Sequence, residues 1–111
     1  MFEVGCWSYL SIKQKMSALQ RYLIVHSILY YYFNESVITD KKYDKYSRLL
    51  VELKNQNRSE YKETDYFYCM KDFDGSTGFD LYDRLNNHDR DYLTKIANSV
   101  LKNYKGGVKN V

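Results

Sequence analysis

The chain has 111 residues, 44% of them hydrophobic and 28% charged, and a formal net charge of +3. This length corresponds to one domain over residues 1–111, and the apolar content excludes intrinsic disorder of the whole chain. The longest apolar stretch, residues 22–33, is shorter than the roughly 20 residues that a membrane span requires, and two cysteines are too few for a disulfide scaffold. We therefore expect a cytoplasmic protein with reduced thiols and no membrane partner.

The first predicted element is a long helix. Ser11 followed by Gln14 fits a capping box, in which the serine side chain accepts from a backbone amide and the glutamine reaches back. The helical pattern continues to about Phe33, and its second half is apolar almost all round. This helix is expected to be the central one of the domain.

A second helix follows a short connection at residues 34–36. Thr39 or Asp40 suits its N-cap, and apolar residues at heptad-like spacing continue to about Asn57. Lysines and arginines make segment 41–58 basic, and we place them on the outer face of this helix. Residues 11–57 are thus predicted to form a helical hairpin.

The next part of the chain is expected to be less regular. Polarity rises over residues 55–64, which predicts a loop. Residues 66–70 are aromatic and β-prone, which favours a short isolated or edge strand. Residues 75–78 predict a turn, in which Ser76 or Thr77 would cap a helix starting at Phe79.

Two helices are predicted after that turn. The first is short and runs from Phe79 to about Leu85. A break with a cap at residues 86–87 follows, and then an amphipathic helix of about four turns whose apolar residues lie within 93–104. Gly106 and Gly107 are expected to end the last helix. The predicted fold is therefore mainly α, a helical hairpin with a short strand and two further C-terminal helices. Residues 65–104 form the strand-turn-helix extension, and residues 105–111 a flexible basic tail.

The most specific motif spans residues 26–44, with the sequence HSILYYYFNESVITDKKYD. It resembles the small N-terminal (Ia) domain of bacterial NAD-dependent DNA ligases, in which a helix ending in Tyr followed by His or Tyr leads through a loop to Asp-x-x-Tyr-Asp. The resemblance covers roughly residues 14–57. It departs from the family pattern at Ser36, where a proline is usual, and at Asn34, where an aspartate is usual.

The resemblance implies a site for the nicotinamide mononucleotide (NMN) half of NAD. The matching positions in this sequence are Tyr30, Tyr31, Asp40, Tyr43 and Asp44. Aromatic faces can stack on the positively charged nicotinamide ring, and carboxylates can neutralise it or accept hydrogen bonds from ribose hydroxyls. NMN or NAD is therefore the expected ligand.

The other parts of a ligase are missing from this sequence, including the Lys-x-Asp-Gly nucleophile motif. We therefore expect no enzymatic activity and interpret the chain as an accessory protein built on one ligase-like module. The small size and the Tyr-, Lys- and Asn-rich composition are typical of phage or mobile-element proteins of an AT-rich bacterial host. A purely structural interpretation is also open, in which Tyr30 and Tyr43 are core residues and Asp40 is an N-cap.

A second functional hypothesis concerns the acidic segment 60–91. Its carboxylates and tyrosines suit docking to a host or defence protein, so the chain would be a phage-encoded inhibitor, for example an anti-CRISPR. The candidate interaction residues are Asp72, Asp74 and Asp80. Direct nucleic-acid binding is not expected, because the basic segment lies in no nucleic-acid-binding motif.

The remaining chemical motifs are weak. Residues 72–77 resemble the aspartate nucleophile loop of haloacid-dehalogenase-like phosphatases, but too little chain follows for that fold, so we predict a turn. His26 is expected to be a hydrogen-bonded core or cleft histidine, and His88 to lie near a helix start. With two isolated histidines and two isolated cysteines, no metal site is predicted.

Overall fold

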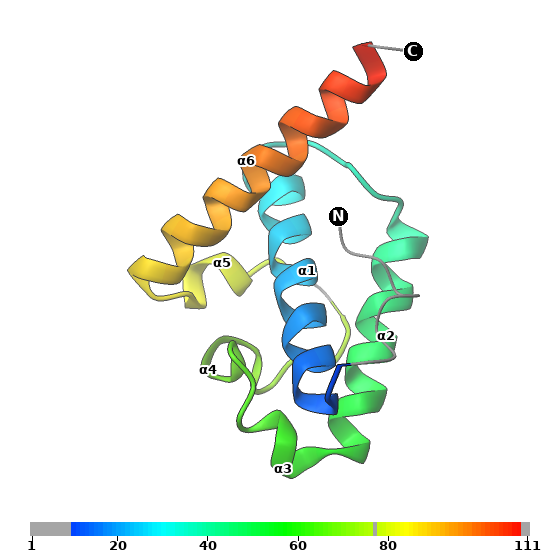
Figure 1. Cartoon of the computed structure of the whole chain (residues 1–111), viewed down its shortest axis with the longest axis vertical. Coiled ribbons are helices and arrows are strands. Elements are labelled where there is room, and N and C mark those ends of the chain that lie inside the picture. Colours follow the sequence, from blue (N-terminus) through cyan, green and yellow to red (C-terminus); the bar gives the residue numbers. More distant parts are fainter. Residues whose placement is uncertain (1–9, 77, 110–111) are drawn as a thin grey trace.

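The computed structural model describes residues 10–76 and 78–109, with side chains up to Tyr104. These residues form helices and connecting segments only, without a strand, so the mainly α prediction is confirmed. Figure 1 shows one helix through the middle of the molecule, with the others packed around it. The helices are α1 (Ile12–Tyr32), α2 (Asp40–Gln56), α3 (Arg58–Tyr61), α4 (Phe67–Met70), α5 (Leu81–Arg84) and α6 (Asn87–Lys109).

Helix α1 is the central element, as its sequence predicts. Its capping box is formed, because the Gln14 amide donates to the Ser11 hydroxyl at 3.1 Å and the Ser11 amide donates to the Gln14 side chain at 2.9 Å. Residues on all sides of the helix are buried from Met16 to Leu29. α1 contacts α2, α3, α5 and α6, and it therefore organises the whole core.

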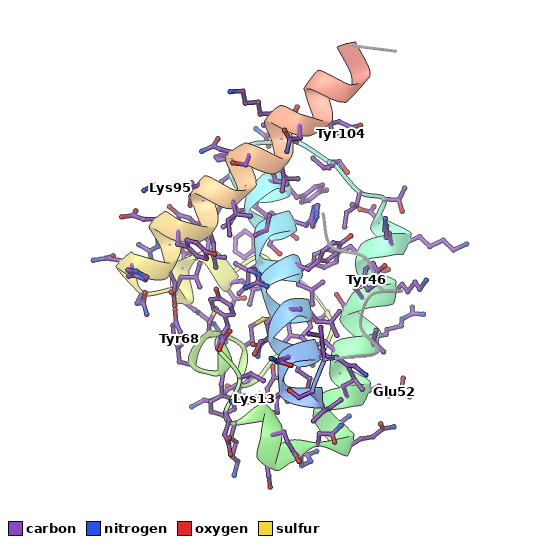
Figure 2. The ribbon with its side chains drawn as sticks, in the orientation of Figure 1. Lys13, Tyr46, Glu52, Tyr68, Lys95 and Tyr104 are labelled. Carbon is purple, nitrogen blue, oxygen red and sulfur yellow. The ribbon has the colours of Figure 1, made fainter. Side chains whose placement is uncertain are left out.

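Helices α1 and α2 form the predicted hairpin. Thr39 is the N-cap of α2, and its hydroxyl accepts from the Lys42 amide at 3.1 Å. Tyr46 and Leu50 are buried on the inner face of α2. The Tyr46 ring meets the Tyr22 ring of α1 edge-on at 4.9 Å, and Figure 2 shows Tyr46 between the two helices.

The predictions for residues 55–70 are wrong in two places. The expected loop contains α3, and the expected strand at residues 66–70 is helix α4. Tyr66, Cys69 and Met70 are all buried, and their i, i+3, i+4 spacing places them on one side of a helical turn. The Tyr61 hydroxyl of α3 donates to the Met70 carbonyl at 2.7 Å and so links the end of α4 to α3. Tertiary packing thus overrides the β-propensity of the aromatic residues.

Gln20 of α1 anchors the α3–α4 segment. The side chain is fully buried, its Nε2 donates to the Thr64 hydroxyl at 2.8 Å, and its Oε1 accepts from the Tyr66 amide at 3.1 Å. Both ends of the amide are therefore satisfied inside the core, which is the condition for burying a polar side chain at low cost.

The C-terminal part differs from its prediction at the start of α5 and at the end of α6. α5 starts at Leu81 and has no side-chain cap, so the expected capping at Phe79 is wrong; Ser76 bonds to Asp74 instead, and Thr77 lies outside the described residues. α6 begins at Asn87, and the predicted cap at Asn86 and Asn87 is confirmed, because the Asn86 side chain accepts from the Asp89 amide at 2.7 Å.

Helix α6 also ends later than predicted. Its backbone continues through Gly106 and Gly107 to Lys109, so the two glycines do not end it, and the predicted tail is helical over residues 105–109. Residues 110–111 lie outside the described part. The second half of α6 extends past the end of α1 (Figure 1). None of the helices in the described residues has the length and apolar character needed to cross a membrane.

Candidate functional site

A cavity of about 260 Å³ lies where α1 ends and α2 begins. Its walls come from the last two turns of α1, the connecting loop, the first turns of α2, and Ser76 and Gly78. All five residues proposed for nucleotide binding line it, namely Tyr30, Tyr31, Asp40, Tyr43 and Asp44. The structure thus brings the predicted site residues together in one place.

The loop between the helices turns sharply at the end of α1. The Phe33 amide donates to the Ile28 carbonyl at 3.3 Å, and the Glu35 amide donates to the Leu29 carbonyl at 2.9 Å. Asn34, between them, has a left-handed backbone with φ of 53°. Asparagine is among the residues that tolerate this conformation best, so it suits the turn that directs the chain back toward α2.

Tyr43 is held in the cavity wall by a hydrogen bond across the hairpin. Its hydroxyl lies 2.8 Å from the Ser27 hydroxyl, which itself donates to the Leu23 carbonyl at 2.8 Å. Because the Ser27 proton is used on that carbonyl, Tyr43 is the donor of the pair. Burial raises the pKa of Tyr43, so the phenol stays protonated at neutral pH.

Gly78 closes the cavity beside this pair. A Cβ atom at position 78 would collide with the Ser27 hydroxyl and with the Tyr43 hydroxyl. Only glycine therefore fits here without moving the pair. The sequence predicted a turn at Gly78 but gave no sign of its contact with Ser27 and Tyr43, because those residues are distant along the chain.

Tyr30 and Tyr31 form an aromatic rim at the cavity. Their side chains are 51% and 38% exposed, and their rings meet edge-on at 4.9 Å. The Tyr31 ring also meets the Phe79 ring edge-on at 5.6 Å. The alternative in which Tyr30 is a core residue is therefore wrong, and its aromatic face is accessible to a ligand.

The cavity is lined by acidic side chains. Asp40 and Asp44 are exposed on the first turns of α2, and Glu35 comes from the loop. Among the described residues that form the walls there is no lysine or arginine. The alternative role of Asp40 as the N-cap is wrong, because Thr39 caps the helix. The cavity is thus electrostatically suited to a cationic group.

His26 forms a buried part of the wall. It is 4% exposed, its ring lies 4.5 Å from the Tyr22 ring, and neither ring nitrogen has a hydrogen-bond partner among the described residues. Burial, with a smaller contribution from Lys42, lowers the pKa of His26 to about 4. His26 is thus a neutral cleft histidine, and the expected hydrogen bond to the protein is not made.

His26 also borders a second, larger hollow. This apolar groove of about 830 Å³ lies between α1 and α6 and is lined by residues such as Tyr22, Val25, Ile96 and Tyr104. His26 and Val37 line both the acidic cavity and the apolar groove. The other histidine, His88, lies near the start of α6 as predicted, and its side chain is 90% exposed.

The three acids proposed for protein docking do not form one free cluster. Asp72 is exposed, whereas Asp74 accepts from the Ser76 amide at 3.0 Å and from its hydroxyl at 2.6 Å. These hydrogen bonds lower the pKa of Asp74. Asp80 pairs with Arg84 at 2.8 Å. In the described part of the chain, no group of three or more His, Cys, Asp or Glu side chains is placed to hold a metal ion.

Comparisons with known proteins give no match, either to a family model, to a curated protein or to a solved structure. The chemistry of the cavity is therefore the basis for a functional proposal.

Proposed function

We propose that the chain is a non-enzymatic module that binds NMN, free or as part of NAD, in the cavity between α1 and α2. The observation that carries this proposal is that all five residues taken from the ligase-like motif line one cavity. They come from two helices, and the motif by itself did not require that their side chains meet.

The charge and shape of the cavity support a nicotinamide ligand. Oxidised nicotinamide has a positively charged aromatic ring, which is attracted by tyrosine faces and by carboxylates. Tyr30 and Tyr31 offer the faces, and Asp40 and Asp44 offer the charges and can accept from ribose hydroxyls. The volume of about 260 Å³ is just below the range of roughly 300–1,000 Å³ typical for drug-sized ligands, so it suits a mononucleotide better than a whole dinucleotide.

The hydrogen bonds in the wall support a binding role without catalysis. Ser27 directly follows His26 in the sequence, but the proton of its hydroxyl is donated to the Leu23 carbonyl. A serine nucleophile needs its proton directed to a general base. The Ser27 hydroxyl is instead used to position Tyr43.

Calorimetric and NMR titration of the purified chain with NMN and NAD tests the proposal. We expect saturable binding with Kd at or below about 1 mM, equivalent to about −4 kcal/mol. Tyr30→Ala should weaken binding by removing a rim aromatic. Tyr92→Ala is the matched control, because Tyr92 is 49% exposed against 51% for Tyr30 but lies on α6, away from the cavity.

A second pair of variants tests the charges. Asp44→Asn should weaken NMN binding, whereas Asp91→Asn, an exposed position on α6, should leave it unchanged. No heat and no chemical-shift change in the wild-type chain at NMN concentrations of about 10 mM, tenfold above the expected limit, would refute the proposal.

The exposed aromatic rim favours a second candidate, a phage-encoded inhibitor that docks on a host or defence protein. Phe79 is 65% exposed beside Tyr31, and it directly precedes the acidic Asp80. Aromatic anchors next to charged residues are typical of protein interfaces. If the chain is such an inhibitor, Phe79→Ala and Asp72→Lys should weaken its binding to the host protein, while NMN should cause no chemical-shift change in the chain.

A further inference from the structure

The buried imidazole of His26 needs a polar partner that none of the described residues supplies. Neutral imidazole has one N–H donor and one nitrogen acceptor, and neither is satisfied by a described residue. Buried polar side chains in proteins are nearly always hydrogen-bonded, to protein, to water or to a ligand. Since His26 lines the acidic cavity, a molecule in that cavity can provide the partner.

A merely structural role does not explain this residue well. The contact with the Tyr22 ring and the apolar neighbours would be made equally by a leucine or phenylalanine, which have no polar atoms to satisfy. The buried, unpartnered nitrogens therefore indicate a binding group.

We propose that His26 recognises the carboxamide of the nicotinamide ring and makes the cavity select the amide over the acid. This inference rests on the proposed nicotinamide site. A carboxamide has one acceptor oxygen and an NH₂ donor, so it can pair with an imidazole nitrogen that faces the cavity whether that nitrogen is the donor or the acceptor of the neutral ring.

The acid form of the ring substituent is disfavoured for two reasons. A carboxylate only accepts hydrogen bonds, so it cannot pair with the acceptor nitrogen of His26, whereas the NH₂ group of the amide can. A carboxylate also brings a negative charge into a cavity that already contains Glu35, Asp40 and Asp44. Nicotinic acid mononucleotide should therefore bind more weakly than NMN.

The first test uses the wild-type chain. We expect nicotinic acid mononucleotide to bind at least about tenfold more weakly than NMN, equivalent to about 1.4 kcal/mol. The ring resonances of His26 should shift when NMN binds. His88 is the internal control, because its side chain is 90% exposed and remote from the cavity, and these are the two histidines of the chain.

The second test uses His26→Leu, which replaces the imidazole with an apolar side chain of similar size and removes both nitrogens. We expect NMN binding to weaken about tenfold and nicotinic acid mononucleotide binding to change little, so that the selectivity falls. His88→Leu is the matched control and should bind both ligands as the wild type does.

The outcomes separate the two proposals. Absence of NMN binding by the wild-type chain refutes the nicotinamide site and this inference together. Binding of NMN with equal affinity for the acid, or with unchanged selectivity in His26→Leu, refutes the role of His26 and leaves the site intact. If His26→Leu does not fold, the wild-type selectivity and the His26 resonances decide: equal affinities or an unshifted His26 ring refute the inference.

Discussion

Acid should destabilise this protein through His26. The unfolded chain has an ordinary histidine pKa of about 6.5, whereas burial and Lys42 lower the pKa of His26 to about 4 in the folded state. Protonation therefore favours the unfolded state. The contribution of neutral His26 to the free energy of unfolding is fully present above about pH 6.5. It falls as the pH drops from about 6.5 to about 4 and is lost below that.

The size of the effect follows from the two pKa values. A fall from 6.5 to about 4 corresponds to about 3 kcal/mol over the full window, at 1.36 kcal/mol per pH unit. Between pH 7 and pH 4.5 the expected loss is about 2 kcal/mol. With a urea m-value of about 1–3 kcal/mol/M, the unfolding midpoint should shift by about 1–2 M.

Urea unfolding of the wild type and of His26→Leu at several pH values measures this contribution. The carboxylates titrate in both proteins, so the difference between the two curves isolates His26. Wild type should lose about 2 kcal/mol more than the variant between pH 7 and pH 4.5. Parallel pH dependences would show that His26 is not buried as an uncharged imidazole and would contradict the predicted acid sensitivity.

Three further predictions concern the cavity wall, the core and the ligand. Gly78→Ala should cost about 1–3 kcal/mol of stability and weaken NMN binding, because the new methyl group displaces the Tyr43 and Ser27 hydroxyls; unchanged urea unfolding and NMN titration would contradict this. Gln20→Leu should cost about 1–3 kcal/mol in urea unfolding by leaving the Tyr66 amide unpaired, with NMN affinity unchanged. Reduced NMN, whose ring is uncharged, should bind about 2- to 30-fold more weakly than oxidised NMN in calorimetry, since cation–π attraction contributes about 0.5–2 kcal/mol. Equal affinity for the two oxidation states would show that the tyrosines and carboxylates do not recognise the ring charge.

The hairpin was predictable because its signals are local. The Ser11–Gln14 capping box and the Thr39 cap each involve residues three positions apart, and both are formed in the structure. The apolar second half of α1 also predicted its central position, since a helix that is hydrophobic all round must be enclosed. In a long helix the apolar pattern repeats over several turns, so the secondary-structure preference of any single residue matters little.

Residues 66–70 were mispredicted because the run is short and its partner is distant. Five residues rich in aromatics satisfy strand propensity and a single helical turn about equally well. In the structure the helical turn is held by Gln20, which lies 46 residues earlier in the chain and accepts a hydrogen bond from the Tyr66 amide. A contact of that sequence separation cannot be found from local patterns.

The candidate site was predictable only in part. The tyrosines and aspartates at its rim were found through a linear motif, but Ser27 and Gly78 enter the site through packing. His26 was expected to bond to the protein, as most buried histidines do. His26 lines the cavity instead, and neither ring nitrogen has a partner among the residues that the structure describes.

The neutral state of His26 links the acid sensitivity to the selectivity for the carboxamide. Burial, with a smaller contribution from the positive charge of Lys42, lowers its pKa. A protonated imidazole would donate from both nitrogens and would favour a carboxylate ligand, whereas the neutral ring donates once and accepts once. A pKa of about 6.5 for His26, measured by NMR in the free chain, would therefore contradict the stability prediction and the basis for amide recognition at once.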